Sequence, residues 1–453
     1  MTHDLFDQPV GLPPEAVAPW NATATAFLAH GAAAPGHLAD TLAAAPGAGG
    51  PRALKALFLY LLGRRETAAQ ARAALTEACR LGLASARERA LADAAEAALA
   101  GEPTRAVAHL EAWLARAPGD MLLLKLSHAI RFTLGDAEGM RASLDRAAPA
   151  YGADHAGRGY YLGCHAFALE ETGDTEAAAR AGRAALEIAP DDAWGLHAVA
   201  HVHDRTGDAA GGLAWLSGRE AAWAHCNNFR FHVWWHKALM LVDTGALDAA
   251  LALYDAEVRA ERTDDWRDVS NAASLLMRLD LEGLDTGDRW DELASLSAAR
   301  TDDGCMVFAD LHYLMALMGG GRGDAQAAML ARIARDAQGG SDLAGRMASP
   351  ALDVAQGLEA FGDGRYDAAF DSLRASRATL HRAGGSQAQR DVFERLCIDA
   401  GLRAGRVAEA EAVLIDRTAR RGAEDGFAAA RHALIAQARD GGEGACAPQH
   451  AAE

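Results

Sequence analysis

The chain has 453 residues, 62 of them acidic and 44 of them lysine or arginine, which gives a formal net charge of −18. A nucleic-acid partner is therefore not expected, because binding to a phosphate backbone depends on clustered basic residues. No stretch approaches the ~20 apolar residues of a membrane helix, the first residues lack a secretory leader pattern, and the six cysteines form no CxxC pair. We expect a cytoplasmic protein with no membrane partner.

Alanine and leucine are abundant while valine and isoleucine are sparse, which favours an all-α fold. Residues 1–85 have a helical but poorly repetitive pattern, and we interpret them as an irregular N-terminal cap. Residues 86–438 form a repetitive region, and the last residues, 439–453, have the composition of a disordered tail. Within the repetitive region the spacing between turn glycines is 34 to 41 residues, with one gap of 78 that corresponds to about two units. These glycines are Gly101, Gly135, Gly173, Gly207, Gly245, Gly323, Gly364 and Gly405.

The segment 159–192 shows the repeat most clearly. Its pattern is a helix, a Gly-Asp turn at Gly173, and a second helix that Pro190 closes, with small residues such as Ala166 and Ala178 at packing positions. This unit resembles the tetratricopeptide repeat, a helix-turn-helix of about 34 residues. Units of this kind stack one on the next. The resemblance implies an all-α superhelical solenoid with a less regular N-terminal helical cap.

Two histidine pairs distinguish this chain from a solenoid that only has to pack. The segments "HAVAH" and "HVWWH" place His197 with His201, and His232 with His236, at the i, i+4 spacing that puts both side chains on one face of a helix. Nine of the 17 histidines fall between residues 128 and 236, and seven of the nine tryptophans fall between residues 194 and 290. Function is therefore expected in this window.

The tetratricopeptide register separates groove-facing residues from core residues, because the first helix of each unit lines the concave groove of such solenoids. Carried over to three consecutive units, it predicts that aromatic, imidazole and carboxylate side chains face one pocket. The residues placed there are Tyr160, Phe167, Glu170, Glu171, Trp194, His197, His201, Asp204, Arg205, His232 and Trp235, with His236 close beside them. The same register gives His128, His165, His203 and His312 core positions, where we expect local hydrogen bonds to satisfy them.

The block that carries the paired histidines also resembles a specific family. The segments "WGLHAVAHVHDRTGD" and "NNFRFHVWWHKALMLVDTGALDAALALYD" are similar to the tetratricopeptide repeat protein 38 family. The resemblance implies the same solenoid over most of the chain and directs attention to the same residues. It does not imply a reaction.

Two kinds of chemistry suit these side chains. Four imidazoles from neighbouring helices are a ligand set for zinc, iron or copper, and Glu170 or Asp204 would orient a ring or add an oxygen ligand. Without a metal, histidines beside carboxylates would transfer protons, as hydrolysis requires. Cys226 is a weaker candidate for a nucleophile, because a lone loop cysteine is more often passive. No motif for a nucleotide cofactor is present, so none is expected.

These observations predict a small-molecule pocket in the concave face. Histidine-based acid–base chemistry would be carried out by His197, His201, His232 and His236. The residues expected to position the substrate are Trp194, Trp235, Tyr160, Phe167, Arg205, Asn227 and Asn228. The alternative is a non-catalytic scaffold that binds a partner peptide in an open groove, as many tetratricopeptide solenoids do, and a homodimer through the ends of the solenoid is also compatible with the sequence.

Overall fold

The structure is a computed structural model, and it describes residues 2–440. Within this range the fold is all-α apart from one small antiparallel pair, β1 (Thr2–His3) and β2 (Pro9–Val10). The predicted all-α solenoid is thus confirmed at the level of an array in which consecutive helices pack as neighbouring pairs. No helix in residues 2–440 is long and apolar enough to cross a membrane.

The N-terminal half begins with the predicted cap and continues into the helix pairs. Residues up to 85 form α1 (Pro14–Leu28), α2 (Ala34–Ala44), α3 (Gly50–Leu61) and α4 (Arg65–Leu81). The next helices are α5 (Ala86–Leu99), α6 (Pro103–Leu114), α7 (Met121–Leu134), α8 (Ala137–Ala147), η1 (Ala148–Ala150), α9 (Arg158–Glu171), α10 (Thr175–Ile188), α11 (Ala193–Arg205), α12 (Ala209–Leu216) and η2 (Glu220–Ala222).

The C-terminal half continues the same pattern. Its helices are α13 (Phe229–Asp243), α14 (Leu247–Leu253), η3 (Tyr254–Val258), α15 (Trp266–Leu281), α16 (Arg289–Ala298), α17 (Val307–Gly319), α18 (Gly323–Asp336), α19 (Asp342–Arg346), η4 (Met347–Ala351), α20 (Leu352–Gly362), α21 (Tyr366–Ser376), η5 (Leu380–Ala383), α22 (Gln387–Arg403), α23 (Val407–Arg421) and α24 (Gly426–Asp440). The predicted tail starts at the end of α24, and residues 441–453 lie outside the described residues.

Gly-Asp turns connect several of the helix pairs. Gly135, for example, ends α7 with a left-handed backbone, and the next residue, Asp136, caps α8 by accepting a hydrogen bond from the third residue of that helix. Seven of the eight predicted glycines have positive φ, whereas Gly323 is the first residue of α18. The wide gap between Gly245 and Gly323 is explained by two further positive-φ glycines, Gly283 after α15 and Gly321 after α17, which continue the regular spacing.

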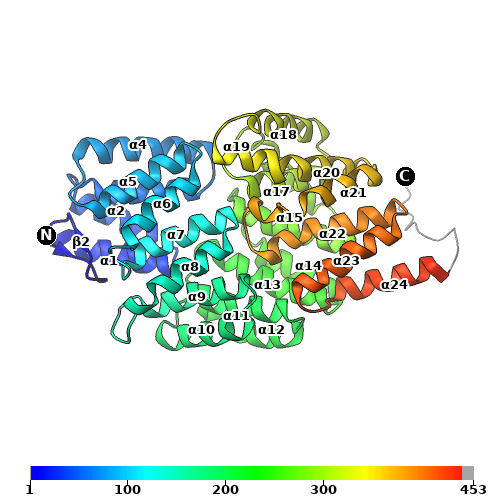
Figure 1. Ribbon diagram of the computed structural model, residues 1–453, viewed down its shortest axis with the longest axis horizontal. Coiled ribbons are helices and arrows are strands. Elements are labelled where there is room, and N and C mark those ends of the chain that lie inside the picture. Colours follow the sequence, from blue (N-terminus) through cyan, green and yellow to red (C-terminus); the bar gives the residue numbers. More distant parts are fainter. Residues whose placement is uncertain (1, 441–453) are drawn as a thin grey trace.

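The array closes on itself, so that segments far apart in sequence lie side by side. In Figure 1 the yellow α19 lies beside the blue α6, and the orange α22 lies beside α15. The backbone N–H of Gln387 donates to the Glu171 carboxylate at 3.0 Å, and the N–H of Gly385 donates to the carbonyl of Phe132 at 3.1 Å. The C-terminal helices therefore cover the concave side of the N-terminal helices.

The two halves of the hydrophobic core meet at α13. Val233 and Met240 pack into the core of the N-terminal half, whereas Trp235 and Leu239 pack into the core of the C-terminal half. One of the two histidine pairs lies on this helix and the other on α11, which packs against it. The candidate site is therefore buried near the junction of the two halves.

Candidate functional site

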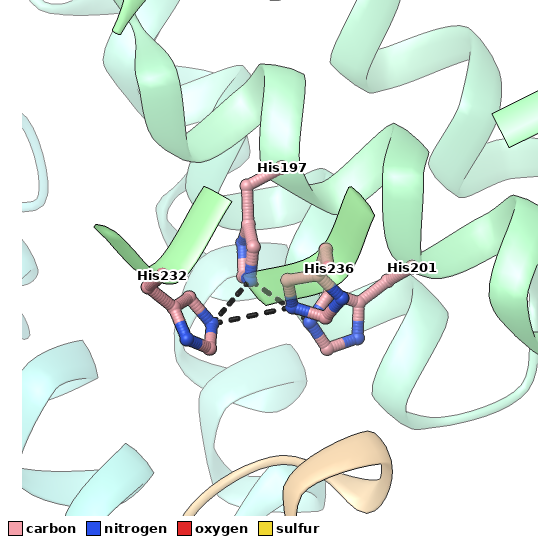
Figure 2. Close-up of side chains that lie close together, drawn as sticks. All are labelled: His197, His201, His232 and His236. Atoms are coloured by element: carbon pink, nitrogen blue, oxygen red, sulfur yellow. Dashed lines mark hydrogen bonds between the residues drawn. The ribbon is translucent and has the colours of Figure 1, made fainter. Parts of the chain in front are cut away.

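The four histidines of the two pairs converge on one point, and we call them the histidine cluster. His197 and His201 come from α11, and His232 and His236 come from α13. Their Nε2 atoms face one another, with 2.9 Å between His201 and His197, 3.0 Å between His197 and His232, and 3.2 Å between His232 and His236 (Figure 2). One nitrogen from each ring lies within 4.8 Å of the other three. The i, i+4 spacing thus creates one four-nitrogen site.

Two of the rings have an oxygen atom behind their Nδ1 atoms, from Asn271 in one case and from Glu170 in the other. Nδ1 of His232 lies 3.0 Å from Oδ1 of Asn271, and Nδ1 of His201 lies 3.3 Å from a Glu170 carboxylate oxygen, with Glu171 at 4.0 Å. With the proton of neutral His232 on Nδ1, its Nε2 presents a lone pair to the centre of the cluster, whereas the carboxylate beside His201 favours the protonated ring. Such outer partners are typical of metal-binding histidines.

Burial sets the protonation of the cluster. It lowers the pKa values of His197 and His236 well below the ordinary value, and the neighbouring imidazoles lower them further. Burial also lowers the pKa of His232, to about 3, although Asn271 opposes the shift. In His201 burial acts in the same direction, but the Glu170 carboxylate outweighs it and the pKa is raised. Three rings are therefore neutral, with lone pairs available to a cation.

The spacing of the nitrogens fits a transition metal. A metal at ~2.1 Å from two adjacent ligand nitrogens separates them by about 3.0 Å in octahedral and about 3.4 Å in tetrahedral geometry. The three short contacts in the cluster span 2.9 to 3.2 Å. Imidazole nitrogen suits zinc, copper, iron and nickel. The buried carboxylates of Glu170 and Glu171, behind His201, would balance part of the added positive charge.

Aromatic rings hold the imidazoles in place. Phe167 stacks on His197 with 5.7 Å between ring centroids, Trp235 stacks on His232 at 5.2 Å, and Trp194 lies 5.0 Å from His197. Phe167 and Trp235 have no exposed surface, so they support the rings. Trp194 differs from them because it also lines a cavity.

Two cavities reach the cluster from different sides. An apolar cavity of about 400 Å³ is lined by His232, Asn271, Trp194 and side chains of the first three helices. A charged cavity of about 810 Å³ is lined by His201, by Glu170 and Glu171, and by arginines and acids of α22 and α23. The size of the apolar cavity is that of a small-molecule site. The charged cavity brings solvent and ions towards His201.

The other predicted site residues are distributed around these two cavities. Asn227 and Asn228 line the apolar cavity, and Asp204 and Arg205 line the charged one. Asp204 does not orient an imidazole, because its carboxylate is 3.0 Å from the Arg421 guanidinium. Tyr160 points elsewhere, and its hydroxyl donates to Asp191 at 3.0 Å. Of the predicted carboxylates, Glu170 and Glu171 are the ones beside the cluster.

Cys226 is a buried thiol in the described structure. Its sulfur lies 3.6 Å from the carbonyl of Ala29 and 3.7 Å from Nε2 of His225. Burial raises the pKa of the thiol to about 12, with the nearby acids Asp192 and Asp191 adding to the shift. The thiolate that a nucleophile requires is therefore disfavoured, in line with the passive interpretation.

Among the residues of the apolar cavity that sequence reasoning missed are His30, Lys125, His128 and Asn271. His128 was expected to be satisfied by local hydrogen bonds, and this is wrong, because neither of its ring nitrogens has a hydrogen-bond partner. His30 belongs to the cap, where no repeat register could place it. The sequence does contain one indication for Lys125, because it is an isolated lysine within the apolar run "MLLLKLSHAI".

No protein-family model matches the sequence. Membership of the tetratricopeptide repeat protein 38 family therefore stays a prediction that rests on the paired-histidine block. Independently of any family, the structure contains an all-α array with a buried histidine cluster and aromatic rings packed around it.

Proposed function

We propose that the protein is an enzyme that binds a small molecule in the apolar cavity and acts on it with a transition metal ion held by the histidine cluster. The observation that carries the proposal is the convergence of four Nε2 atoms, all within 4.8 Å, in a buried site. Imidazole nitrogens this close together share a proton or a cation, and four of them from two helices form a ligand set for one transition metal ion.

The reaction class that this arrangement supports best is hydrolysis. A bound metal would lower the pKa of a coordinated water to ~7 and supply hydroxide without a serine or cysteine nucleophile. His232 lines the apolar cavity, so a substrate there lies next to the metal position. Burial around the cavity strengthens electrostatic interactions with the reacting group.

The alternative is a peptide-binding scaffold. It requires an open concave groove, whereas hydrogen bonds such as that from Gln387 to Glu171 close this face. A peptide would have to reach the histidines through the charged cavity at His201 or the apolar cavity at His232. The closed face and the small cavity favour the small-molecule function.

The proposal is tested by measuring metal content in protein without a histidine tag. Wild type is expected to bind about one equivalent of zinc, copper, iron or nickel, and the double variant His197→Ala/His232→Ala to lose it. A matched control is His165→Ala/His203→Ala, because these two histidines pair with Asp145 and Asp208 outside the cluster. Equal metal binding by wild type and the cluster variant would overturn the metal site.

The catalytic part has its own test. Hydrolysis of a small aromatic ester, 2-naphthyl acetate, is followed with metal-loaded, metal-stripped and reloaded protein. We expect activity that disappears on stripping, returns on reloading and is absent from the cluster variant. Metal binding without metal-dependent hydrolysis would refute esterase activity on this substrate.

A further inference from the structure

The apolar cavity has an unusual balance of charge. Lys55, Lys125 and Arg267 line it, and none of its described lining residues is an aspartate or a glutamate. The chain as a whole is strongly acidic, with 62 acidic residues against 44 basic ones. Arg267 is already paired with Asp265 at 2.7 Å, and Lys55 is exposed. The cation inside the cavity that remains to be explained is therefore Lys125.

Lys125 is one of three lysines in the sequence, and 3% of its surface is exposed. Its ammonium lies 3.7 Å from Sγ of Cys164 and 4.5 Å from the centre of the Trp194 ring. Among the described residues no carboxylate oxygen lies within 4.0 Å of it, and Asp192 interacts with it electrostatically from beyond that distance. A thiol is a weak acceptor, and a buried cation without a direct ion pair is costly.

Further polar groups beside Lys125 also lack partners. The indole N–H of Trp194, both ring nitrogens of His128 and Nε2 of His30 are buried without a hydrogen-bond partner, and all three side chains line the cavity. Burial lowers the pKa of both histidines, and the charge of Lys125 lowers it further, so their rings are neutral and can each donate one N–H. Unpaired buried donors next to such a cation match the acceptor oxygens of an acid.

We infer that the apolar cavity recognises a small organic acid, with Lys125 binding its anionic group and the indole N–H of Trp194 and the ring of His128 available as further donors. The body of the ligand lies against apolar side chains of the cavity, including Phe58, Phe132 and Phe229. This inference rests on the proposed function and specifies its substrate class as an apolar or aromatic molecule that carries an acidic group.

Lys125 also lies near the histidine cluster. The ammonium is 4.5 Å from the Trp194 ring centre, and that centre is 5.0 Å from the centre of the His197 ring. The indole of Trp194 is therefore close both to the ammonium of Lys125 and to one ring of the histidine cluster. Lys125 and His232 line the same cavity, so an acid bound by Lys125 lies in the cavity that reaches the proposed metal position.

The test compares two nearly isosteric ligands, 2-naphthylacetate and its neutral amide, by isothermal titration calorimetry. Wild type is expected to bind the acid at least tenfold more tightly than the amide. Lys125→Met keeps the length of the side chain and removes the charge. In this variant the affinities for the acid and the amide are expected to lie within about threefold of each other. Lys237→Met is the matched control, because Lys237 pairs with Glu220 away from the cavity.

The titrations use metal-stripped protein as well as metal-loaded protein, since a carboxylate could also bind the metal. In metal-stripped protein the ratio of the affinities for the acid and the amide depends on the cavity alone. The acid-binding inference and the proposed metal site can therefore be refuted independently of each other. Equal affinity of wild type for acid and amide, or an unchanged preference in Lys125→Met, overturns the inference. Leu38→Trp fills part of the cavity and should weaken the binding of both ligands. If this variant is folded and binds both ligands as tightly as wild type, the ligands bind outside the cavity and the inference is overturned.

Discussion

The hydrogen bond from His232 to Asn271 gives a quantitative test of the metal site. The two atoms are 3.0 Å apart, and both side chains are buried, with 2% of Asn271 exposed. Replacing Asn271 with leucine keeps the approximate volume and removes the acceptor. In metal-free protein His232 can respond by moving its proton to Nε2, where His197 and His236 offer partners. With metal bound, Nε2 is occupied and the proton must remain on Nδ1.

The cost of the substitution therefore falls on the metal-bound state. A buried N–H without an acceptor costs about 1–3 kcal/mol, which corresponds to a loss of about 5- to 150-fold in metal affinity. Substitution of such outer partners typically weakens metal binding by about 10- to 100-fold. Competition with a chromophoric chelator measures this affinity directly for zinc at fixed pH.

Two further variants complete the experiment. Asn271→Asp keeps an acceptor for Nδ1 and is expected to bind zinc at least as tightly as wild type. Asn227→Ala is a control from the same cavity, whose side chain accepts from the backbone N–H of Phe229 instead of a histidine. If Asn271→Leu binds zinc with the wild-type affinity while its fold is intact, the tautomer argument and the metal geometry built on it are refuted.

Three other predictions follow from buried groups. Lys125→Met should raise the melting temperature of the ligand-free protein, because it removes a buried cation without a direct ion pair; a lower melting temperature would show that the ammonium is well satisfied. The pKa of Asp192 is raised to about 7 by burial, so between pH 4 and 7 the folded state holds a proton that the unfolded state releases. Stability should therefore fall as pH rises through this window, by up to about 1.4 kcal/mol per unit, and Asp192→Asn, which can still cap α11, should flatten this slope in urea titrations; an unchanged slope contradicts the assignment. Cys226→Ser should retain full metal content and ester hydrolysis, and loss of either would restore the thiol as a candidate ligand or nucleophile.

The repeat was readable from the sequence because its signals are local. A glycine that ends one helix and an aspartate that caps the next are consecutive residues, as at Gly173–Asp174 and Gly207–Asp208, and their roles do not depend on distant parts of the chain. Where the signal was ambiguous, in "GGGRGD", the sequence offered several glycines and the turn uses Gly321 instead of Gly323.

The histidine cluster was predictable for the same reason, and its surroundings were not. The i, i+4 spacing places each pair on one helix face, and neighbouring helices of an array bring the two faces together. Asn271 on α15 and His30 beyond α1 reach the site through tertiary contacts, from segments that lie far from the histidines along the chain. A local sequence pattern does not predict such tertiary contacts.

Closure of the array links the fold to the proposed chemistry. An open groove would expose the imidazoles to water, and their pKa values would lie near 6.5. Because α22 and the segment before it cover the concave side, burial lowers the pKa values of His197, His232 and His236, and the rings are neutral ligands at physiological pH. The proposed metal-binding centre therefore depends on long-range contacts such as that between Gln387 and Glu171, which joins a C-terminal helix to a carboxylate 4.0 Å from His201.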